Sequence, residues 1–307
     1  MATFNTRTAP MNVALLVLPD FLLIGFGWLL HRKFSFTREF FASLEKLVYY
    51  VLFPALLFQS ILRVPITVSS AADLFFATAS VAVAGVALSW LALPLLRPTA
   101  LAMASSAQCG YRFNTYIALA LAPSLAGVAG QTTMALIVGF AVPLVNLAAV
   151  YALARQQGSG LFGALLRNPL LMSTVLALAC NFAGLQLPQP VDTLLARLGS
   201  ASIALGILCV GASLTWQPGQ IPFSLIGWIL AVKLLLLPVC AWFIATWLEL
   251  DPLKRQMIIL FAAMPPATGA YVLAVRMGGD GRLVSLMISI GIPLSALTLP
   301  LWLLFIT

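Results

Sequence analysis

The stretch MASSAQCGYRFNTYIALALAPSLAG at residues 103–127 interrupts an apolar part of the chain with a small cluster of polar side chains. A second stretch, FAAMPPATGAYVLAVRMGGDG at residues 261–281, contains Pro265 and Pro266, which an unbroken helix does not tolerate. Both stretches are too polar or too broken for ordinary membrane spans, and neither has the character of a surface loop. We therefore predict two discontinuous helices that meet inside a lipid bilayer, with the remaining spans arranged around them.

The composition of the 307-residue chain predicts an integral membrane protein. Hydrophobic residues make up 62% of the sequence and charged residues only 8%, and the mean hydropathy is +1.06. A soluble domain carries about 25% charged residues, so lipid has to be the solvent for most of this surface. Because each span needs about 20 apolar residues, about ten spans fit in this length. We expect the first apolar segment to be retained as a span, because no signal-peptide cleavage site follows it.

The apolar intervals divide the chain into two halves of five predicted spans each. An N-terminal repeat at 1–154 and a C-terminal repeat at 168–307 flank a polar connector at 155–167, and the fourth span of each half is the broken one. The predicted spans are 12–30, 40–62, 72–96, 99–122, 132–154, 168–185, 191–216, 223–248, 254–277 and 283–305. Interrupted spans at matching positions are the best sequence indication of a transporter's binding site.

The predicted fold is therefore all-α and membrane-embedded, with ten transmembrane helices. Because five is an odd number, the halves form a 5+5 inverted repeat, with crossed, broken helices as the fourth and ninth spans. The loops after odd-numbered spans carry eight basic residues: Arg32, Lys33, Arg38, Arg97, Arg155, Arg167, Arg276 and Arg282. The loops after even-numbered spans carry four: Arg63, Arg197, Lys254 and Arg255. The larger group should be cytoplasmic, which predicts a cytoplasmic connector and both termini on the non-cytoplasmic side.

The net charge of +8 follows from these loop residues rather than from a nucleic-acid site, because no basic cluster is interleaved with aromatic residues. A bound metal or other cofactor is not expected. The four cysteines lack CxxC spacing and His31 is the one histidine. Gly278-Gly279-Asp280 faintly resembles the GxGD motif of intramembrane aspartyl proteases, but a second suitable membrane aspartate is missing. No GxSxG, HExxH or Walker sequence is present either, so we predict that the chain is not an enzyme.

Polar residues at the two breaks are the candidates for a binding site. Arg112 could bind an anionic substrate through its planar guanidinium. It could equally cap carbonyl groups of the broken helix or extend to the membrane interface, and the sequence leaves these alternatives open. A break also exposes backbone groups that need partners, and helix N-termini at a break attract anions. The predicted substrate-binding residues are Arg112, Asn114, Thr115, Tyr116, Asn146, Pro265, Pro266, Ala267, Thr268, Gly269 and Tyr271.

Other polar residues in the spans have less clear roles. Asn146 is more often a contact between helices than a ligand in such a position. Lys233 could be a counter-charge or could extend to the interface, and we favour a structural role. Asp20 could carry a coupling proton or pair with a basic residue, and the sequence does not decide between them.

Five segments carry a resemblance to a known family: LEKLVYYVLFPALLF at 44–58, RFNTYIALAL at 112–121, RNPLL at 167–171, VGASL at 210–214 and MPPATGAYVLAVRMGGD at 264–280. Together they resemble the auxin efflux carrier family, which includes bacterial malate or malonate permeases. The resemblance implies a dimeric inverted repeat in the bacterial inner membrane, with spans one, two, six and seven as a scaffold and the others as a moving transport domain. It also implies that Asn114, Thr115 and residues 265–269 hold an organic anion.

Residues 118–120 read Ala-Leu-Ala where plant members have Gly-x-Pro. We therefore expect Gly110 and Asn114, rather than a proline, to unwind the first broken helix. The first functional hypothesis is a secondary carrier of small organic anions, either carboxylates like auxin or dicarboxylates, working by elevator-type alternating access. The alternatives are a carrier like the cation/proton antiporters, which also have crossed broken helices, and a membrane sensor that binds a ligand without moving it.

Overall fold

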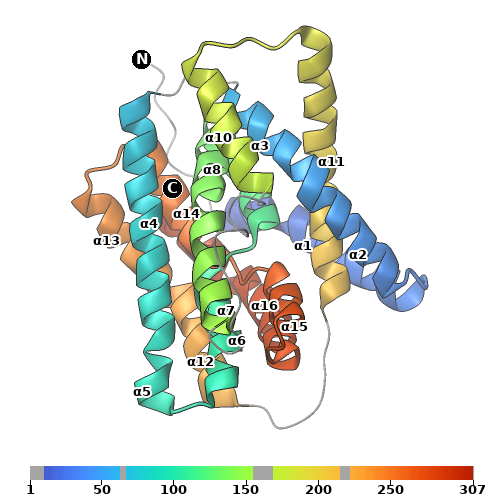
Figure 1. The fold of residues 1–307 in the computed structure, drawn as a ribbon, viewed down its shortest axis with the longest axis vertical. Coiled ribbons are helices and arrows are strands. Elements are labelled where there is room, and N and C mark those ends of the chain that lie inside the picture. The colour runs from blue at the N-terminus through green and yellow to red at the C-terminus, as the bar shows by residue number, and fades with distance from the viewer. Residues whose placement is uncertain (1–9, 63–66, 155–168, 215–221, 307) are drawn as a thin grey trace.

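The described residues of the computed structural model, 10–62, 67–154, 169–214 and 222–306, are almost entirely helical and contain no strand (Figure 1). The elements are α1 (Pro10–Lys33), α2 (Arg38–Leu47), η1 (Val48–Leu52), α3 (Phe53–Leu62), α4 (Val68–Trp90), α5 (Ala92–Leu96), α6 (Ala100–Ser106), α7 (Gln108–Tyr111), α8 (Thr115–Ala154), α10 (Pro169–Phe182), α11 (Gln189–Ser213), α12 (Phe223–Ala231), η2 (Val232–Leu236), α13 (Leu237–Trp247), α14 (Pro252–Ala263), α15 (Gly269–Arg276) and α16 (Gly281–Ile306), where η marks a π-helical turn. The all-α prediction is confirmed for these residues.

Helix occupies each of the ten intervals that the sequence predicts as spans. By length and composition, six helical segments of the described chain could cross a membrane: 38–62, 71–96, 100–153, 189–213, 223–247 and 281–306. The count of ten spans and the inversion of the two halves remain predictions. The connector predicted at 155–167 lies outside the described residues.

The long helix α8 combines the end of the fourth predicted span with the whole of the fifth. Its backbone leaves helical geometry at Ala126 (φ −140°, ψ 26°) and Gly127 (φ 56°, ψ −146°). The second of these conformations is essentially restricted to glycine, because a Cβ atom would clash with the backbone. Gly127 therefore marks the turn that separates the two predicted spans.

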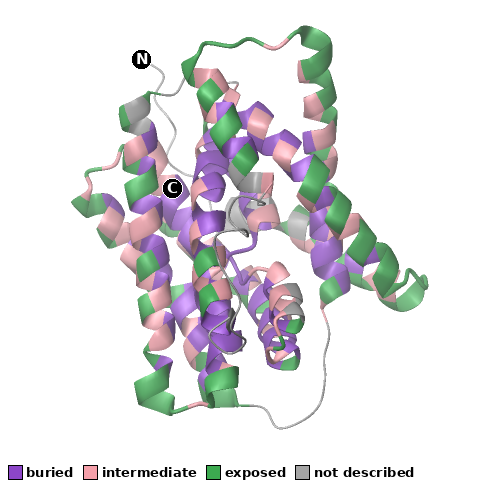
Figure 2. Ribbon diagram, viewed as in Figure 1, coloured by how far each residue is buried: buried purple, intermediate pink, exposed green. Residues whose placement is uncertain are grey.

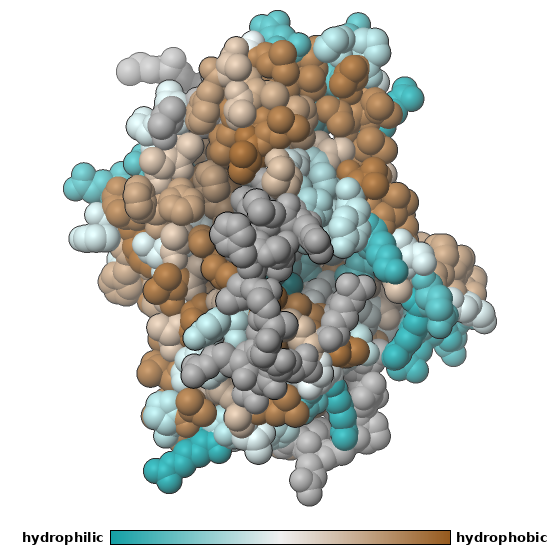
Figure 3. Space-filling view, viewed as in Figure 1, coloured by the Kyte–Doolittle hydropathy of each residue, from teal (hydrophilic) through white to brown (hydrophobic). Residues whose placement is uncertain are grey.

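The outside of the molecule is strongly apolar, as lipid requires. Large hydrophobic side chains are widely exposed, among them Trp247 at 80%, Val83 at 68% and Leu301 at 65%. Hydrophobic residues cover much of the face in Figure 3 outside its grey part. Buried residues concentrate along α8 and the broken segments, whereas α2 and the start of α11 are mostly exposed (Figure 2). An aqueous protein would not expose so much apolar area, so the chain is an integral membrane protein.

Close backbone contact joins α1 to α11. A Cβ atom built on Gly27 would collide with the backbone carbonyl of Leu208, and one on Gly211 would collide with that of Ile24. Small residues allow helix backbones to approach in this way inside membranes. Helix α3 in turn packs against both α10 and α11. The intervals that the family resemblance assigns to a scaffold therefore pack on one another.

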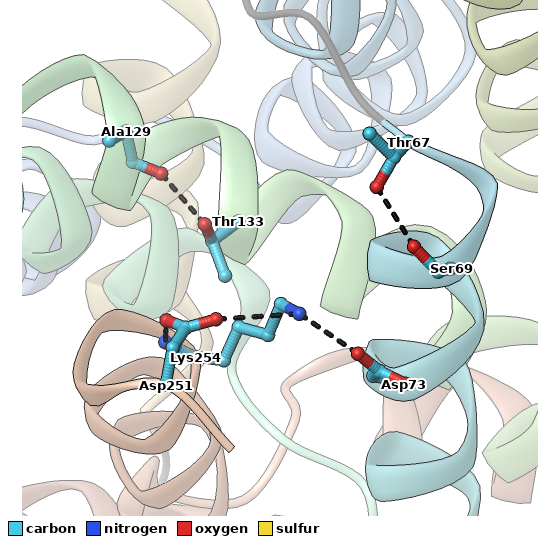
Figure 4. Close-up of polar contacts among 7 residues, drawn as sticks. All are labelled: Thr67, Ser69, Asp73, Ala129, Thr133, Asp251 and Lys254. Carbon is cyan, nitrogen blue, oxygen red and sulfur yellow. Dashed lines mark hydrogen bonds and ion pairs between the residues drawn. The ribbon is translucent and has the colours of Figure 1, made fainter.

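A basic residue ties the start of α14 to α4, as Figure 4 shows. Lys254 Nζ lies 3.2 Å from Asp73 Oδ2 on α4 and 3.4 Å from Asp251 Oδ2, while Asp251 also caps α14 by accepting from Lys254 N. Asp73 and Asp251 are more than two-fifths exposed, so the energetic contribution is small. The contact nevertheless places the starts of α4 and α14 at the same end of the molecule.

We expect Gly27→Ala to destabilise the protein, because the added methyl group overpacks the α1–α11 contact at a cost of about 1–3 kcal/mol. Gly25 is the matched control: it lies two residues away on α1, and a Cβ atom there would meet nothing within 4 Å. Thermal unfolding of the purified variants should show a melting temperature lowered by about 2 °C or more for Gly27→Ala only. Equal melting temperatures for the two variants would contradict the close contact.

Candidate functional site

The first break lies at residues 112–114, between α7 and α8. Arg112 is extended (φ −76°, ψ 147°), and α8 begins at Thr115. Asn114 is 1% exposed, and its side-chain Oδ1 accepts hydrogen bonds from the backbone N–H groups of Tyr116 and Ile117, both at 3.2 Å. Asn114 is thus the N-cap of α8, and it satisfies two of the N–H groups that a helix start leaves free.

The expected role of Gly110 in unwinding this helix is wrong. Gly110 lies within α7, one residue before its end, and a Cβ atom there would collide with Ser89 Oγ on α4. The glycine allows α7 to pack closely against α4, while the change of direction occurs at Arg112 to Asn114. The expectation for Asn114 agrees with its position at the break.

The second break lies at residues 264–268, between α14 and α15. Proline has no N–H group, so Pro265 and Pro266 cannot donate to the carbonyl groups four residues earlier, those of Phe261 and Ala262. The Phe261 carbonyl accepts instead from Met264 N at 3.4 Å. The Ala262 carbonyl accepts from the side chain of Lys233, with Nζ at 3.0 Å. Each carbonyl freed by the proline pair therefore has a replacement donor.

The two breaks contact each other directly. The backbone N–H of Asn114 donates to the carbonyl of Pro265 at 2.8 Å. The rings of Phe113 and Phe261 pack edge to face with their centroids 4.5 Å apart. A Cβ atom on Gly269 would lie 3.5 Å from Arg112 Nη2, so the guanidinium lies beside the start of α15. Residues more than 140 positions apart in the sequence thus form one polar centre.

Two donor groups at this centre have spare hydrogen-bonding capacity. Asn114 Nδ2 is buried and has no partner among the described residues. Arg112 donates from Nη1 to Gln108 Oε1 at 2.7 Å, and no carboxylate in the described chain pairs with it. The segments 108–115 and 264–269 contain no aspartate or glutamate. With two helix N-termini alongside, this arrangement suits an anion.

The structure places the other predicted site residues less centrally. Thr115 is half-buried in the first turn of α8, and Thr268 is buried at the start of α15. The Tyr116 ring packs edge to face on Phe53 at 5.1 Å and against Gly206 of α11. Tyr116 thus faces the helices that the resemblance assigns to a scaffold.

Four further predicted residues are Pro266, Ala267, Tyr271 and Asn146, of which only the first two lie at the second break. The Pro266 ring packs against Gly291 of α16, and Tyr271 packs against Gly281. Ala267 is half-buried, and its carbonyl accepts from Ala270 N in the first turn of α15. Asn146 is half-buried near the end of α8, and no hydrogen bond in the described chain joins it to either break.

Two residues near the breaks were not predicted as part of the site. Gln108 holds the guanidinium of Arg112, and Lys233 holds the end of α14. For Gln108 a sequence signal exists, because it precedes Arg112 by one helical turn. For Lys233 the signal is Pro266, which predicts that some outside donor must reach the Ala262 carbonyl.

The motif Gly278-Gly279-Asp280 has a structural role. Asp280 Oδ1 accepts from Leu283 N at 2.9 Å and so caps α16, while its own N–H donates to Ser105 Oγ at 2.7 Å. This contact places the start of α16 beside α6. A pocket of about 250 Å³ lies elsewhere, between the start of α14 and the end of α16, with Trp242, Arg255 and Phe305 in its lining.

Comparison with known proteins agrees with this picture. A family model described as membrane transport protein matches residues 161–303. A protein of Rhizobium meliloti (strain 1021), named "Putative malonate transporter", is 26% identical over 276 residues, which cover 86% of each chain. The resemblance to the auxin efflux carrier family is confirmed. Both matches point to membrane transport rather than to an enzyme.

We expect Asn114→Ala to lower the melting temperature, because the loss of an N-cap costs about 0.5–2 kcal/mol. Asn114→Ser should retain most of the stability, since serine is also a good N-cap. Thr268→Ala is the matched control at the other break, because the Thr268 side chain makes no cap hydrogen bond to α15. Thermal unfolding of the three variants measures the difference. If Asn114→Ala and Asn114→Ser melt together, the capping role is refuted.

Proposed function

We propose that this protein is a secondary carrier of small organic carboxylates, which binds its substrate where the two breaks meet. The observation that carries the proposal is the buried Nδ2 donor of Asn114, which has no partner among the described residues and lies two positions along the chain from the half-buried Arg112. Leaving a buried donor unpaired costs about 1–3 kcal/mol. An acceptor supplied by a carboxylate would remove that cost when the substrate binds.

The residues around the breaks favour an anion over a cation. Arg112 can present two parallel N–H groups to a carboxylate, and the N-termini of α8 and α15 contribute positive partial charge. Cation/proton antiporters need acidic residues at this point, and both breaks lack them. The named relative suggests malonate, a small dicarboxylate, as one substrate to test.

The proposed arrangement is a 5+5 inverted repeat of ten spans with crossed, broken helices. Two contacts support it. Lys254 joins the start of α14 to the start of α4, and Asp280 joins the start of α16 to α6. In each contact, the two residues lie near the same side of the membrane in the topology that the basic loop residues predict.

Movement of an elevator type would shift one group of helices against the other. The group of α1, α2, α3, α10 and α11 would act as the scaffold, and the breaks would travel with α4, α8, α14 and α16. Tyr116 lies at the proposed boundary, where its ring contacts Phe53 and Gly206. We further propose a homodimer in a bacterial inner membrane, with both termini on the non-cytoplasmic side.

Transport is tested most directly in proteoliposomes that contain the purified protein. We expect accumulation or exchange of at least one labelled carboxylate from a panel that includes malonate, malate and an aromatic monocarboxylate. Protein-free liposomes and an Arg112→Ala sample serve as controls. Binding without accumulation or exchange would favour the sensor alternative, and the absence of both binding and transport would refute the proposal.

For Arg112→Ala we expect carboxylate affinity to fall roughly ten- to hundredfold, since a charge-assisted hydrogen bond contributes about 1.5–3 kcal/mol. Arg112→Lys should restore only part of the affinity, because lysine keeps the positive charge but lacks the two parallel N–H donors of a guanidinium group. Arg255→Ala is the control, since Arg255 lies over the Trp242 ring, 5.6 Å from its centroid, in the pocket away from the breaks. Affinity and melting temperature are measured on the same samples. Unchanged affinity in a stable Arg112→Ala protein would remove Arg112 from the site.

A further inference from the structure

Lys233 is a charged residue placed entirely inside the protein. Its side chain is 0% exposed, and it is the one charged residue among the fully buried polar side chains of the described chain. It lies in the π-helical turn η2, which α4, α7, α14 and α16 surround. The alternative in which Lys233 extends to the membrane interface is therefore wrong. A charged group in this position is costly, so a specific interaction has to retain it.

The interaction is with the C-terminal end of the half-helix α14. Lys233 Nζ donates to the Ala262 carbonyl at 3.0 Å and lies 6.0 Å from the centroid of the Phe261 ring. The Ala262 carbonyl is available because Pro266, four residues later, has no N–H to offer. The last carbonyl groups of a helix also carry partial negative charge. The amine thus lies at the point of the second break that attracts a cation.

Transporters with broken helices bind their coupling ions at such points, where unwound carbonyl groups and half-helix C-termini coordinate Na⁺ or H⁺. A sodium ion requires several oxygen ligands close together. Here a covalently attached ammonium group already occupies the end of α14. No aspartate or glutamate of the described chain forms an ion pair with it.

We propose that Lys233 is a built-in cation, which takes the place of a bound alkali metal ion at the C-terminal end of α14. It acts as a positioning residue: it holds the carbonyl end of α14, and thereby the start of α15 beside Arg112. The consequence for transport, which rests on the proposed carrier function, is that carboxylate binding requires no sodium. The structural part of the inference does not depend on transport.

The structural part is tested by chemical rescue in the absence of carboxylates. Lys233→Ala removes the cation and leaves a space, whereas Lys233→Met removes the cation and fills the space with a side chain of similar length. Both variants should melt below the wild type. Methylammonium chloride, against choline chloride at equal concentration, should raise the melting temperature of Lys233→Ala by about 2–4 °C and leave Lys233→Met and the wild type unchanged.

An equal response of the two variants to methylammonium, or no response from either, would overturn the inference. A second measurement requires no variant. If a carboxylate binds, replacing sodium with choline should change its affinity for the wild type less than twofold, and a sodium requirement would also overturn the inference. Rescue of Lys233→Ala in a protein that neither binds nor moves carboxylates would leave Lys233 as a built-in cation and refute the carrier function alone.

Discussion

The hydrogen bond from the Asn114 N–H to the Pro265 carbonyl is the contact on which the centre of this molecule depends. In hydrocarbon, each backbone group that a broken helix releases needs a protein partner. One break alone would leave such groups unpaired. Two breaks side by side can pair with each other, so the cost of each break falls when the other is present. The same contact brings Arg112 and Gly269 together, which no single span could do.

A proline elsewhere in the structure follows the same requirement. Pro238 cannot donate to the Leu234 carbonyl four residues earlier, and this carbonyl accepts instead from Trp302 Nε1 of α16 at 2.8 Å. Leu234 belongs to the π-helical turn η2, which also contains Lys233. One proline thus adjoins the turn that carries Lys233, and another, Pro266, frees the carbonyl that Lys233 binds. The side chains of neighbouring helices replace the missing donors and connect α14, η2 and α16.

Much of this architecture could be predicted from the sequence, because the signals are local. Apolar intervals predicted where the helices lie, and Pro265-Pro266 predicted the second break to within a residue or two. The first break was less accurately predicted. A glycine such as Gly110 can either let a helix unwind or allow two helices to pack closely, and the sequence is consistent with both. Only the proximity of Ser89, 21 residues earlier, decides this. Pro266 indicates that an outside donor must reach the Ala262 carbonyl, but the sequence does not show that Lys233, 29 positions away, is that donor. Tyr116 shows the same limit, since its neighbours Phe53 and Gly206 come from distant helices.

The charges around the breaks bear on what the proposed site can carry. Two cations adjoin the Phe113–Phe261 contact: Arg112 precedes Phe113 in the chain, and Lys233 Nζ lies 6.0 Å from the centroid of the Phe261 ring. Neither forms an ion pair with a carboxylate in the described chain. Moving an uncompensated charge through a low-dielectric interior is expensive. An anion bound at the breaks would offset part of this positive charge, and the loaded centre would cross the membrane at a lower electrostatic cost than the empty one. On the proposed function, the same charges that attract the substrate also favour movement of the occupied carrier.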